Sequence, residues 1–419
     1  MNHDLNIDLM DPEVQKCPYD AYASLRRECP VYQMPSTGQY VVSTYAELQE
    51  VLRRPDVFSN RMPLKNRRPG GPNPDVAAIY QNEGWEPTTT LQRTDPPEHQ
   101  RYRQYIDRTF TATRVRKLAS YIDGVAHDLI DKFIDDGQVE FVAEFAVPLP
   151  CFVIADQFGV AREDAPKLKY WSDAAMEALG LMISPEREVE CARIAVEAQH
   201  YFAAQFEARQ KNPRDDMMSD MVRPTGDGAK PMSMQELLDM MSQLLNGGNQ
   251  TTTSSLAIGL KLLIDHPDQM TLLRDDPTLM GNFVEEVLRL ETPVQGLFRI
   301  TTCDTTLGGT DIPKGAVIVL LYGSANRDEA KFDHEDDFDI LRRNAGAHLA
   351  FGAGTHFCPG AMLARQEMAS SFTALLARLD NFQFAEGLNS FEYPPSLVHR
   401  NLKNLHLTFD KKRAGNQRA

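Results

Sequence analysis

The chain of 419 residues has no apolar run long enough to cross a membrane, because charged or polar residues interrupt every hydrophobic stretch well before about 20 positions. Its N-terminus, MNHDLNIDLMDPE, also lacks the basic, apolar and cleavage regions of a secretion signal. We therefore expect a cytoplasmic protein that is neither secreted nor anchored to a membrane.

Paired cysteines and a surplus of positive charge are also missing. The cysteines are scattered without a Cys-x-x-Cys pair, so the sequence indicates neither a zinc site nor a disulfide framework. Lys and Arg number 44 against 59 Asp and Glu, which gives a net charge of −15. Because binding to phosphate backbones needs a basic surplus on at least one face, we expect no nucleic-acid partner.

The composition that is present, 42% hydrophobic and 25% charged, is that of an ordinary globular protein with material for a core. Two stretches rich in Pro and Gly, residues 67–74 (RRPGGPNP) and 223–232 (RPTGDGAKPM), predict surface loops. The composition does not change beyond either stretch. We therefore expect a single domain over residues 1–419.

The clearest helix signal begins at Ser233, which can form a capping box with Glu236 before apolar residues recur at helical spacing as far as His266-Pro267. The interior of this helix contains Asn246-Gly247-Gly248-Asn249, four poor helix formers. Either a neighbouring helix packs closely against the glycines, or a ligand approaches the backbone there.

A second helix is predicted from Asp276-Pro277 to about Leu290. Residues 300–321 alternate β-branched runs with Gly-Gly and Pro-Lys-Gly, which predicts short strands. The sequence therefore indicates a mainly α fold with a minor β region.

The stretch 351–360 reads FGAGTHFCPG and precedes a helical segment. A cysteine just ahead of a helix N-terminus has its thiolate stabilised by the helix dipole and by unpaired N–H groups, so we expect a lowered pKa for Cys358. Gly352, Gly354 and Gly360 leave room for a flat macrocycle against the backbone. Taken alone, an inert buried cysteine remains the other interpretation. The Gly352-x-Gly354 pair lacks the rest of a dinucleotide fingerprint.

This stretch resembles the haem-binding loop of cytochromes P450, Phe-Gly-x-Gly-x-His/Arg-x-Cys-x-Gly, from Phe351 onward and at every fixed position. The resemblance implies that Cys358 is the thiolate ligand of a b-type haem, with His356 directed to a haem propionate. It further implies a cytochrome P450 fold, with the haem between the long distal helix and the cysteine loop, and a closing β-hairpin at residues 397–409.

Glu286 and Arg289, at i and i+3 of the second helix, form part of another resemblance. Such a pair is usually a weak, solvated one. In cytochromes P450 the Glu-x-x-Arg motif is a buried ion pair, and Arg342 is our candidate for its third member.

His99 and Arg103 follow the Asp-Pro-Pro at residues 95–97 and share one helix face, which alone indicates a solvated basic surface. The family pattern implies instead that both side chains donate charge-assisted hydrogen bonds to haem propionates. Arg299 resembles the remaining propionate ligand.

The segment from Gly247 to Thr252 resembles the distal motif of the family, in which an acid precedes a threonine. Here Thr251 is present but Gln250 replaces the acid. An amide orients water but cannot ionise. We expect proton delivery through Thr251 and bound water, or through a substrate hydroxyl, with Gln250 only positioning the donors. The alternative is that position 250 tolerates the change.

The resemblance implies a monooxygenase that inserts one oxygen atom from O₂ into a small or medium hydrophobic organic substrate, by hydroxylation, dealkylation or epoxidation. A peroxide-driven peroxygenase and a haem-thiolate sensor are the alternatives; Thr251 disfavours the first, and the lack of an effector domain disfavours the second. The residues expected to line the pocket are Leu244, Gly247, Gly248, Thr251, Val294, Leu297, Val398 and His399.

No flavin domain is recognisable in the sequence, so we expect electrons from separate proteins, an iron–sulfur ferredoxin and its flavin-dependent reductase. Ferredoxins are usually acidic. A local basic patch on the Cys358 side is therefore expected despite the net negative charge, including Arg108, Arg116 and Arg365.

Overall fold

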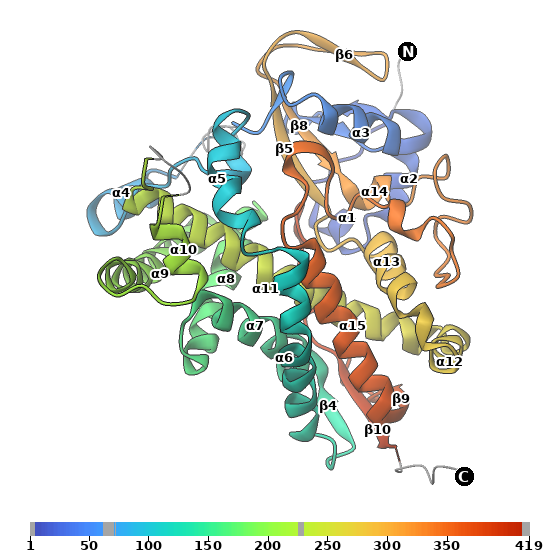
Figure 1. Cartoon of the computed structure of the whole chain (residues 1–419). Helices are drawn as coiled ribbons and strands as arrows, with labels where there is room; N and C mark the ends of the chain where they lie inside the picture. Colours follow the sequence, from blue (N-terminus) through green and yellow to red (C-terminus); the bar gives the residue numbers. More distant parts are fainter. Residues whose placement is uncertain (1–4, 62–70, 72, 225–229, 413–419) are drawn as a thin grey trace.

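The computed structural model describes residues 5–61, 71, 73–224 and 230–412, and helices make up most of it (Figure 1). The helices are α1 (Pro12–Lys16), α2 (Tyr19–Glu28), α3 (Tyr45–Arg53), α4 (Pro74–Glu83), α5 (Glu98–Asp107), α6 (Ala112–Asp131), α7 (Pro148–Phe158), α8 (Ala165–Leu179), α9 (Pro185–Lys211), α10 (Met217–Val222), α11 (Met234–Asp265), α12 (Pro267–Asp275), α13 (Met280–Leu290), α14 (Tyr322–Ala325) and α15 (Ala361–Arg378). Within the described residues, no helix combines the length and the apolar character that a membrane crossing needs.

Helix α11 begins as the sequence predicts. The Ser233 hydroxyl accepts a hydrogen bond from the Glu236 N–H, and the Glu236 carboxylate accepts one from the Ser233 N–H, which completes the capping box. The helix ends at Asp265, ahead of Pro267. Figure 1 shows α11 running through the middle of the molecule, with α7, α8, α9 and α10 on one side.

The second predicted helix differs at its start. Residues Pro277–Leu279 form a 3₁₀ turn, in which the Asp276 carboxylate accepts from the Thr278 N–H at 3.0 Å, and the α-helix α13 begins only at Met280. Its end at Leu290 is as predicted. The predicted loop at 223–232 joins α10 to α11, although residues 225–229 lie outside the described part, as do 67–70 and 72 of the other loop, whose Pro74 begins α4.

The strands are β1 (Val31–Gln33), β2 (Tyr40–Val42), β3 (Phe58–Ser59), β4 (Gln138–Glu140), β5 (Gly296–Thr301), β6 (Thr305–Leu307), β7 (Thr310–Ile312), β8 (Val317–Leu321), β9 (Leu379–Phe384) and β10 (His406–Lys411). They form sheets in the orders β1-β2-β8-β5-β3, β4-β10-β9 and β6-β7. In the largest sheet, β2 runs parallel to β8, and β5 runs antiparallel to it. The strands predicted at 300–321 are therefore confirmed.

The hairpin predicted at residues 397–409 is wrong. Only β10 is a strand there, and its partners are the distant β9 and β4. Asn401 and Asn404, which are poor strand formers, precede β10, and before them the segment makes a single β-bridge between His399 and Val294.

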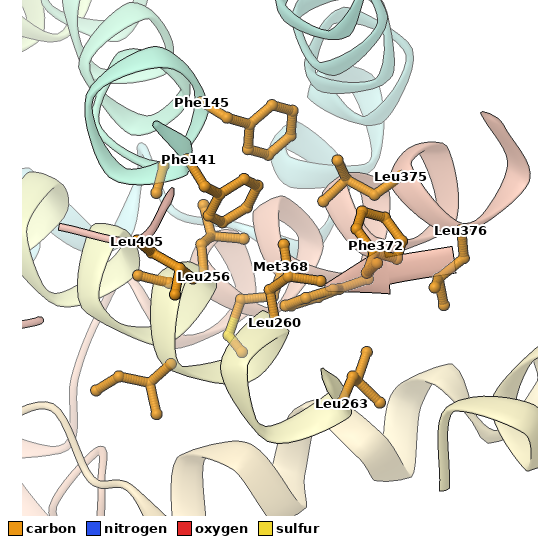
Figure 2. Packing of buried hydrophobic residues seen from close by; sticks show 14 of the residues in the cluster. Phe141, Phe145, Leu256, Leu260, Leu263, Met368, Phe372, Leu375, Leu376 and Leu405 are labelled. Atoms are coloured by element: carbon orange, nitrogen blue, oxygen red, sulfur yellow. The ribbon is translucent and has the colours of Figure 1, made fainter. Parts of the chain in front are cut away.

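The main apolar core lies where α11 crosses α15 (Figure 2). From α11 it takes Leu256, Leu260 and Leu263, and from α15 it takes Met368, Phe372, Leu375 and Leu376, with Phe141, Phe145 and Leu405 from other segments. Each such side chain contributes roughly 1.5–3 kcal/mol when fully buried. This packing fixes the long helix against the helix that follows Cys358.

Candidate active site

The loop that holds Cys358 folds back on itself. The Cys358 N–H donates to the Phe351 carbonyl at 2.9 Å, and Gly352 and Gly354 adopt positive φ angles of 68° and 65°. A Cβ on Gly354 would lie only 2.8 Å from the Leu52 carbonyl oxygen. The turn itself therefore requires glycine at positions 352 and 354. Gly360, the N-cap residue of α15, lies close to the sulfur of Cys358.

The thiol of Cys358 does not have the lowered pKa that we expected. Removal of solvent by the surrounding protein raises the pKa of the thiol, although the N–H groups of Gly360 and Ala361 and the charge of Arg103 oppose the shift. Part of the residue remains accessible. The helix end alone therefore does not stabilise the thiolate, and a metal cation bound by the sulfur would supply the missing positive charge.

Arg365 supports the loop from the side. Its guanidinium carbon lies 4.5 Å from the centre of the Phe351 ring, and its Nη2 lies 2.8 Å from Glu285. Burial alone would raise the pKa of Glu285, but hydrogen bonds from Arg365 and His348 hold it at about 2. Arg365 is therefore paired within the fold, and its membership of the expected basic patch stays a prediction.

Four nitrogen-bearing side chains gather beside the loop, and we call them the cationic cluster: His99 and Arg103 of α5, Arg299 of β5, and His356. The rings of His99 and His356 have centres 4.3 Å apart. Burial, then Arg299 and His99, lower the pKa of His356 to about 3. The positive charge of the cluster is therefore that of Arg103 and Arg299, and the ring of His356 is neutral near pH 7.

No described carboxylate of the protein neutralises the buried charge of Arg299 in this cluster. Arg299 is buried, donates to the Phe298 carbonyl at 2.8 Å, and forms no ion pair with any described carboxylate. The buried Nε2 of His356 has no hydrogen-bond partner among the described residues. A buried charge and an orphaned nitrogen are costly unless a ligand satisfies them. Carboxylates of a haem propionate type fit this requirement.

Arg103 is the member of the cluster with partners of its own. Its Nη1 donates to the Phe357 carbonyl at 2.6 Å, and its Nη2 lies 2.8 Å from Asp107. It thereby ties α5 to the residue before Cys358.

The Glu-x-x-Arg pair is buried, as the resemblance implied. Arg289 Nε lies 2.7 Å from Glu286 Oε2, and both side chains are fully buried. Arg342, the candidate third member, places its Nε 3.0 Å from Glu286 Oε1. The prediction of this three-residue network is confirmed.

The two glycines of α11 have different surroundings. A Cβ on Gly248 would lie 3.1 Å from Ile154 Cδ1 of α7, whereas a Cβ on Gly247 would meet no described atom within 4 Å. Gly248 therefore serves close helix packing, and Gly247 faces open space. Thr251, one turn after Gly247, donates to its carbonyl at 2.9 Å. Close packing therefore explains Gly248, and the approach of a ligand at Gly247 stays a prediction.

Gln250 does not point into that open space. It is buried, and its Nε2 donates to Asp173 of α8, which also pairs with Lys169. Sequence reasoning missed Asp173, because Lys169 and Asp173 at i and i+4 look like an ordinary surface pair. It also missed Glu367, a buried acid of α15, although Glu367 shares one helix face with the buried Leu363 and Ser371.

The expected pocket residues divide into two groups. Leu244 is buried in a cluster with side chains of α7 to α10. Val294, Leu297 and Val398 pack together in another cluster, and the β-bridge places His399 beside Val294. His399 borders a small crevice with Gln295 and Tyr393, and burial lowers its pKa to about 4.

Comparison with known proteins agrees with this geometry. The family model for Cytochrome P450 matches residues 186–399. A biotin biosynthesis cytochrome P450 of Bacillus subtilis is 31% identical over 401 residues, covering 95% of this chain and 98% of the relative. A steroid C26-monooxygenase of Mycobacterium tuberculosis is 33% identical, covering 93% of each chain. The structure of cytochrome P450 CREJ in complex with (4-ethylphenyl) dihydrogen phosphate matches with a TM-score of 0.88 at 27% identity, covering 97% of this chain and 99% of that one.

The chain therefore belongs to the cytochrome P450 family, whose cofactor is haem. It has the cytochrome P450 fold, and it is a cytochrome P450 monooxygenase.

Proposed function

We propose that this monooxygenase binds haem b with Cys358 as the axial thiolate and oxidises a small or medium hydrophobic substrate with electrons from a separate ferredoxin and reductase. The observation that carries the proposal is the cationic cluster beside the Cys358 loop, whose buried Arg299 has no described carboxylate to pair with. When bound, the haem supplies the oxygen chemistry of the family.

The protein's own residues would bind the haem, leave room for the substrate and hold the elements of the site in place. His99, Arg299 and His356 would hold the propionates of the haem, and the positive φ angles of Gly352 and Gly354 let the Cys358 loop turn. Gly247 borders open space that a substrate could enter, and the hydroxyl of Thr251 donates to the Gly247 carbonyl. Val294 and Leu297, which are partly buried, offer apolar surface to a substrate, whereas Val398 packs behind them in the core. The Glu286 network and Arg365 hold the elements that carry these groups.

The axial ligand is tested by the spectrum of the reduced protein with carbon monoxide. The wild type is expected to show the red-shifted Soret band of a thiolate ligand, and Cys358→Ser is expected to lose it. Cys303→Ser, at an exposed thiol, is the matched control. Loss of the band in both variants, or in neither, contradicts the assignment.

Turnover is tested by product formed per NAD(P)H consumed, with a ferredoxin system in one arm and hydrogen peroxide in the other. We expect turnover in the ferredoxin arm, and a changed yield in Thr251→Ala and Gln250→Glu. Turnover with peroxide alone would make the protein a peroxygenase. An unchanged yield in both variants would remove positions 250 and 251 from proton delivery.

A further inference from the structure

Asn60, the residue that follows β3, carries a buried amide without a partner. The residue is only 7% exposed, and its Nδ2 forms no hydrogen bond within the part of the chain that the structure describes. A buried N–H group without an acceptor destabilises a fold, so native proteins leave few such groups unsatisfied. The amide of Asn60 therefore indicates an acceptor that does not belong to the described polypeptide.

The sheet brings Asn60 to the side of Arg299. Strand β3 pairs antiparallel with β5, and Ser59 lies opposite Ile300. Asn60 follows Ser59 and Arg299 precedes Ile300, so this register brings Asn60 and Arg299 to the same end of the pair. Opposite residues of an antiparallel pair direct their side chains to the same face. The amide of Asn60 is therefore placed on the side of the sheet where Arg299 is buried without an anion.

Asp95 fixes Asn60 against the start of α5. Its Oδ1 accepts from the Asn60 N–H at 2.9 Å, and its backbone carbonyl accepts from the His99 N–H, also at 2.9 Å. The Ser59 hydroxyl donates to the same carboxylate. Asn60 is thus held between the strand that carries Arg299 and the helix that carries His99, which are two members of the cationic cluster.

The other carboxylates of this region are paired elsewhere. Glu98 lies 2.5 Å from Arg61, and Asp107 lies 2.8 Å from Arg103. Neither forms a hydrogen bond with Asn60 Nδ2. The acceptor for this amide must therefore come from a ligand. A carboxylate on the ligand fits, because its oxygens accept from several donors at once and its charge suits the cationic cluster.

We propose that the side-chain amide of Asn60 donates a hydrogen bond to the haem propionate that Arg299 neutralises. An amide has a donor end and an acceptor end, and a carboxylate favours the orientation that presents the N–H groups to it. Asn60 is thus a haem-binding residue outside the motifs from which the other propionate ligands were predicted. This inference rests on the proposed haem-thiolate function.

Two substitutions separate the donor from the shape of the side chain. Asn60→Asp keeps the shape but replaces the donor with an anion, which repels a propionate. Asn60→Val removes the polar group. Asn212→Asp, at an exposed position just after α9, makes the same change of charge elsewhere and is the matched control.

The first readout is the rate at which the ferric protein loses haem to an excess of apomyoglobin. Asn60→Val is expected to lose haem roughly 10- to 100-fold faster than the wild type, because a buried hydrogen bond to a charged acceptor is removed. Asn60→Asp is expected to lose it at least as fast, and Asn212→Asp to match the wild type. Wild-type rates in both Asn60 variants would overturn the proposal.

The second readout reports the contact itself. Cells grown on ¹³C-labelled 5-aminolaevulinate place the label in the propionate carboxyl groups, and the reduced carbon-monoxide form gives sharp resonances because it is diamagnetic. We expect one carboxyl resonance to shift in Asn60→Val while the other stays, and neither to shift in Asn212→Asp. A purely structural role for Asn60 would not single out one carboxyl group. Unchanged resonances in the Asn60 variants would overturn the proposal.

Failure of the inference and failure of the proposed function are distinguishable. The red-shifted carbon-monoxide band of the wild type tests the haem-thiolate assignment with Asn60 intact, and its absence would overturn both proposals. A normal band together with unchanged Asn60 variants would overturn the inference alone. If Asn60→Val does not fold, Asn60→Asp, which keeps the shape of the side chain, decides by the same two measurements: faster haem loss and one shifted carboxyl resonance support the contact, and wild-type values contradict it.

Discussion

Arg342 binds the carboxylate of Glu286 from 56 positions away in the sequence, with its Nε 3.0 Å from Oε1. Arg289 donates to both oxygens, from Nε to Oε2 at 2.7 Å and from Nη2 to Oε1 at 2.9 Å, and the Asp339 N–H donates to Oε1 at 3.1 Å. The guanidinium groups are satisfied in turn by backbone carbonyls, among them that of Asp337. A buried carboxylate with this many donors is stable only as the complete set.

Glu286→Gln is expected to destabilise the protein by about 3–5 kcal/mol, because it leaves two buried guanidinium groups without their anion. Urea unfolding of the haem-loaded protein measures the change. Glu50→Gln, in an exposed pair with Arg54, is the control and is expected to change the free energy of unfolding by less than about 1 kcal/mol. Equal unfolding midpoints for wild type and Glu286→Gln would show that the network does not stabilise the fold.

The two glycines of α11 are expected to respond oppositely to alanine. Gly247→Ala adds a methyl group in open space and removes a poor helix former, which raises stability by about 0.8–1 kcal/mol. Gly248→Ala places a methyl group 3.1 Å from Ile154 Cδ1, and crowding of this kind costs about 1–3 kcal/mol.

Urea unfolding again provides the measurement, and Ile154→Val provides the matched background. Since valine lacks the crowding methyl group, the penalty of Gly248→Ala is expected to shrink or vanish in Ile154→Val, while the effect of Gly247→Ala stays the same. Shifts of the same sign for both glycine variants would contradict the different surroundings of the two positions.

The sequence predicted features that depend on local chemistry. The capping box of α11 and the end of α13 follow from side chains within one or two turns. The cysteine loop and the Glu286 pair came from motifs with fixed spacing. Arg342 could also be predicted as a member of the Glu286 network, because the resemblance implies a third, basic residue.

The contacts that were missed join segments far apart in the chain, and nothing in either segment's sequence indicates that it contacts the other. Gln250 and Asp173 are 77 positions apart, and nothing in the Lys169–Asp173 pair distinguishes it from a solvated one. The pKa of Cys358 was predicted with the wrong sign, because helix termini are visible in a sequence while burial is a property of the fold. The false hairpin at 397–409 has the same origin, since the partners of β10 precede it by more than twenty residues.

His399 is expected to make stability depend on pH between about 4 and 6.5. Burial lowers its pKa from 6.5 to about 4 in the native state, so the unfolded chain binds a proton in this range and the native protein does not. Stability is therefore fully present above pH 6.5 and falls as the pH drops, by at most about 1.4 kcal/mol per pH unit.

His399→Gln removes this titration. Its urea midpoint is expected to fall less steeply than that of the wild type between pH 6.5 and 5, whereas exposed His127→Gln is expected to follow the wild type. Parallel curves for wild type and His399→Gln would mean that position 399 does not hold a neutral histidine.

Arg116 is expected to be the basic side chain that guides an electron donor to the Cys358 side. It lines a groove of about 340 Å³ with Met362 and Arg365, between α6 and α15. Its Nη2 donates to Thr113 at 3.3 Å, and no described carboxylate forms an ion pair with it. Arg365, in contrast, is bound by Glu285. An acidic electron donor would therefore be attracted by the accessible charge of Arg116.

Arg116→Glu is expected to lower the rate of reduction by an acidic ferredoxin roughly 10-fold at low ionic strength and to weaken the dependence of that rate on salt, because steering by charge is screened within about 10 Å at 0.1 M salt. Arg193→Glu, on the exposed surface of α9, makes the same change of charge elsewhere and is expected to leave the rate near that of the wild type. Equal losses in both variants would assign the effect to net charge, and the groove between α6 and α15 would then not be where the donor binds.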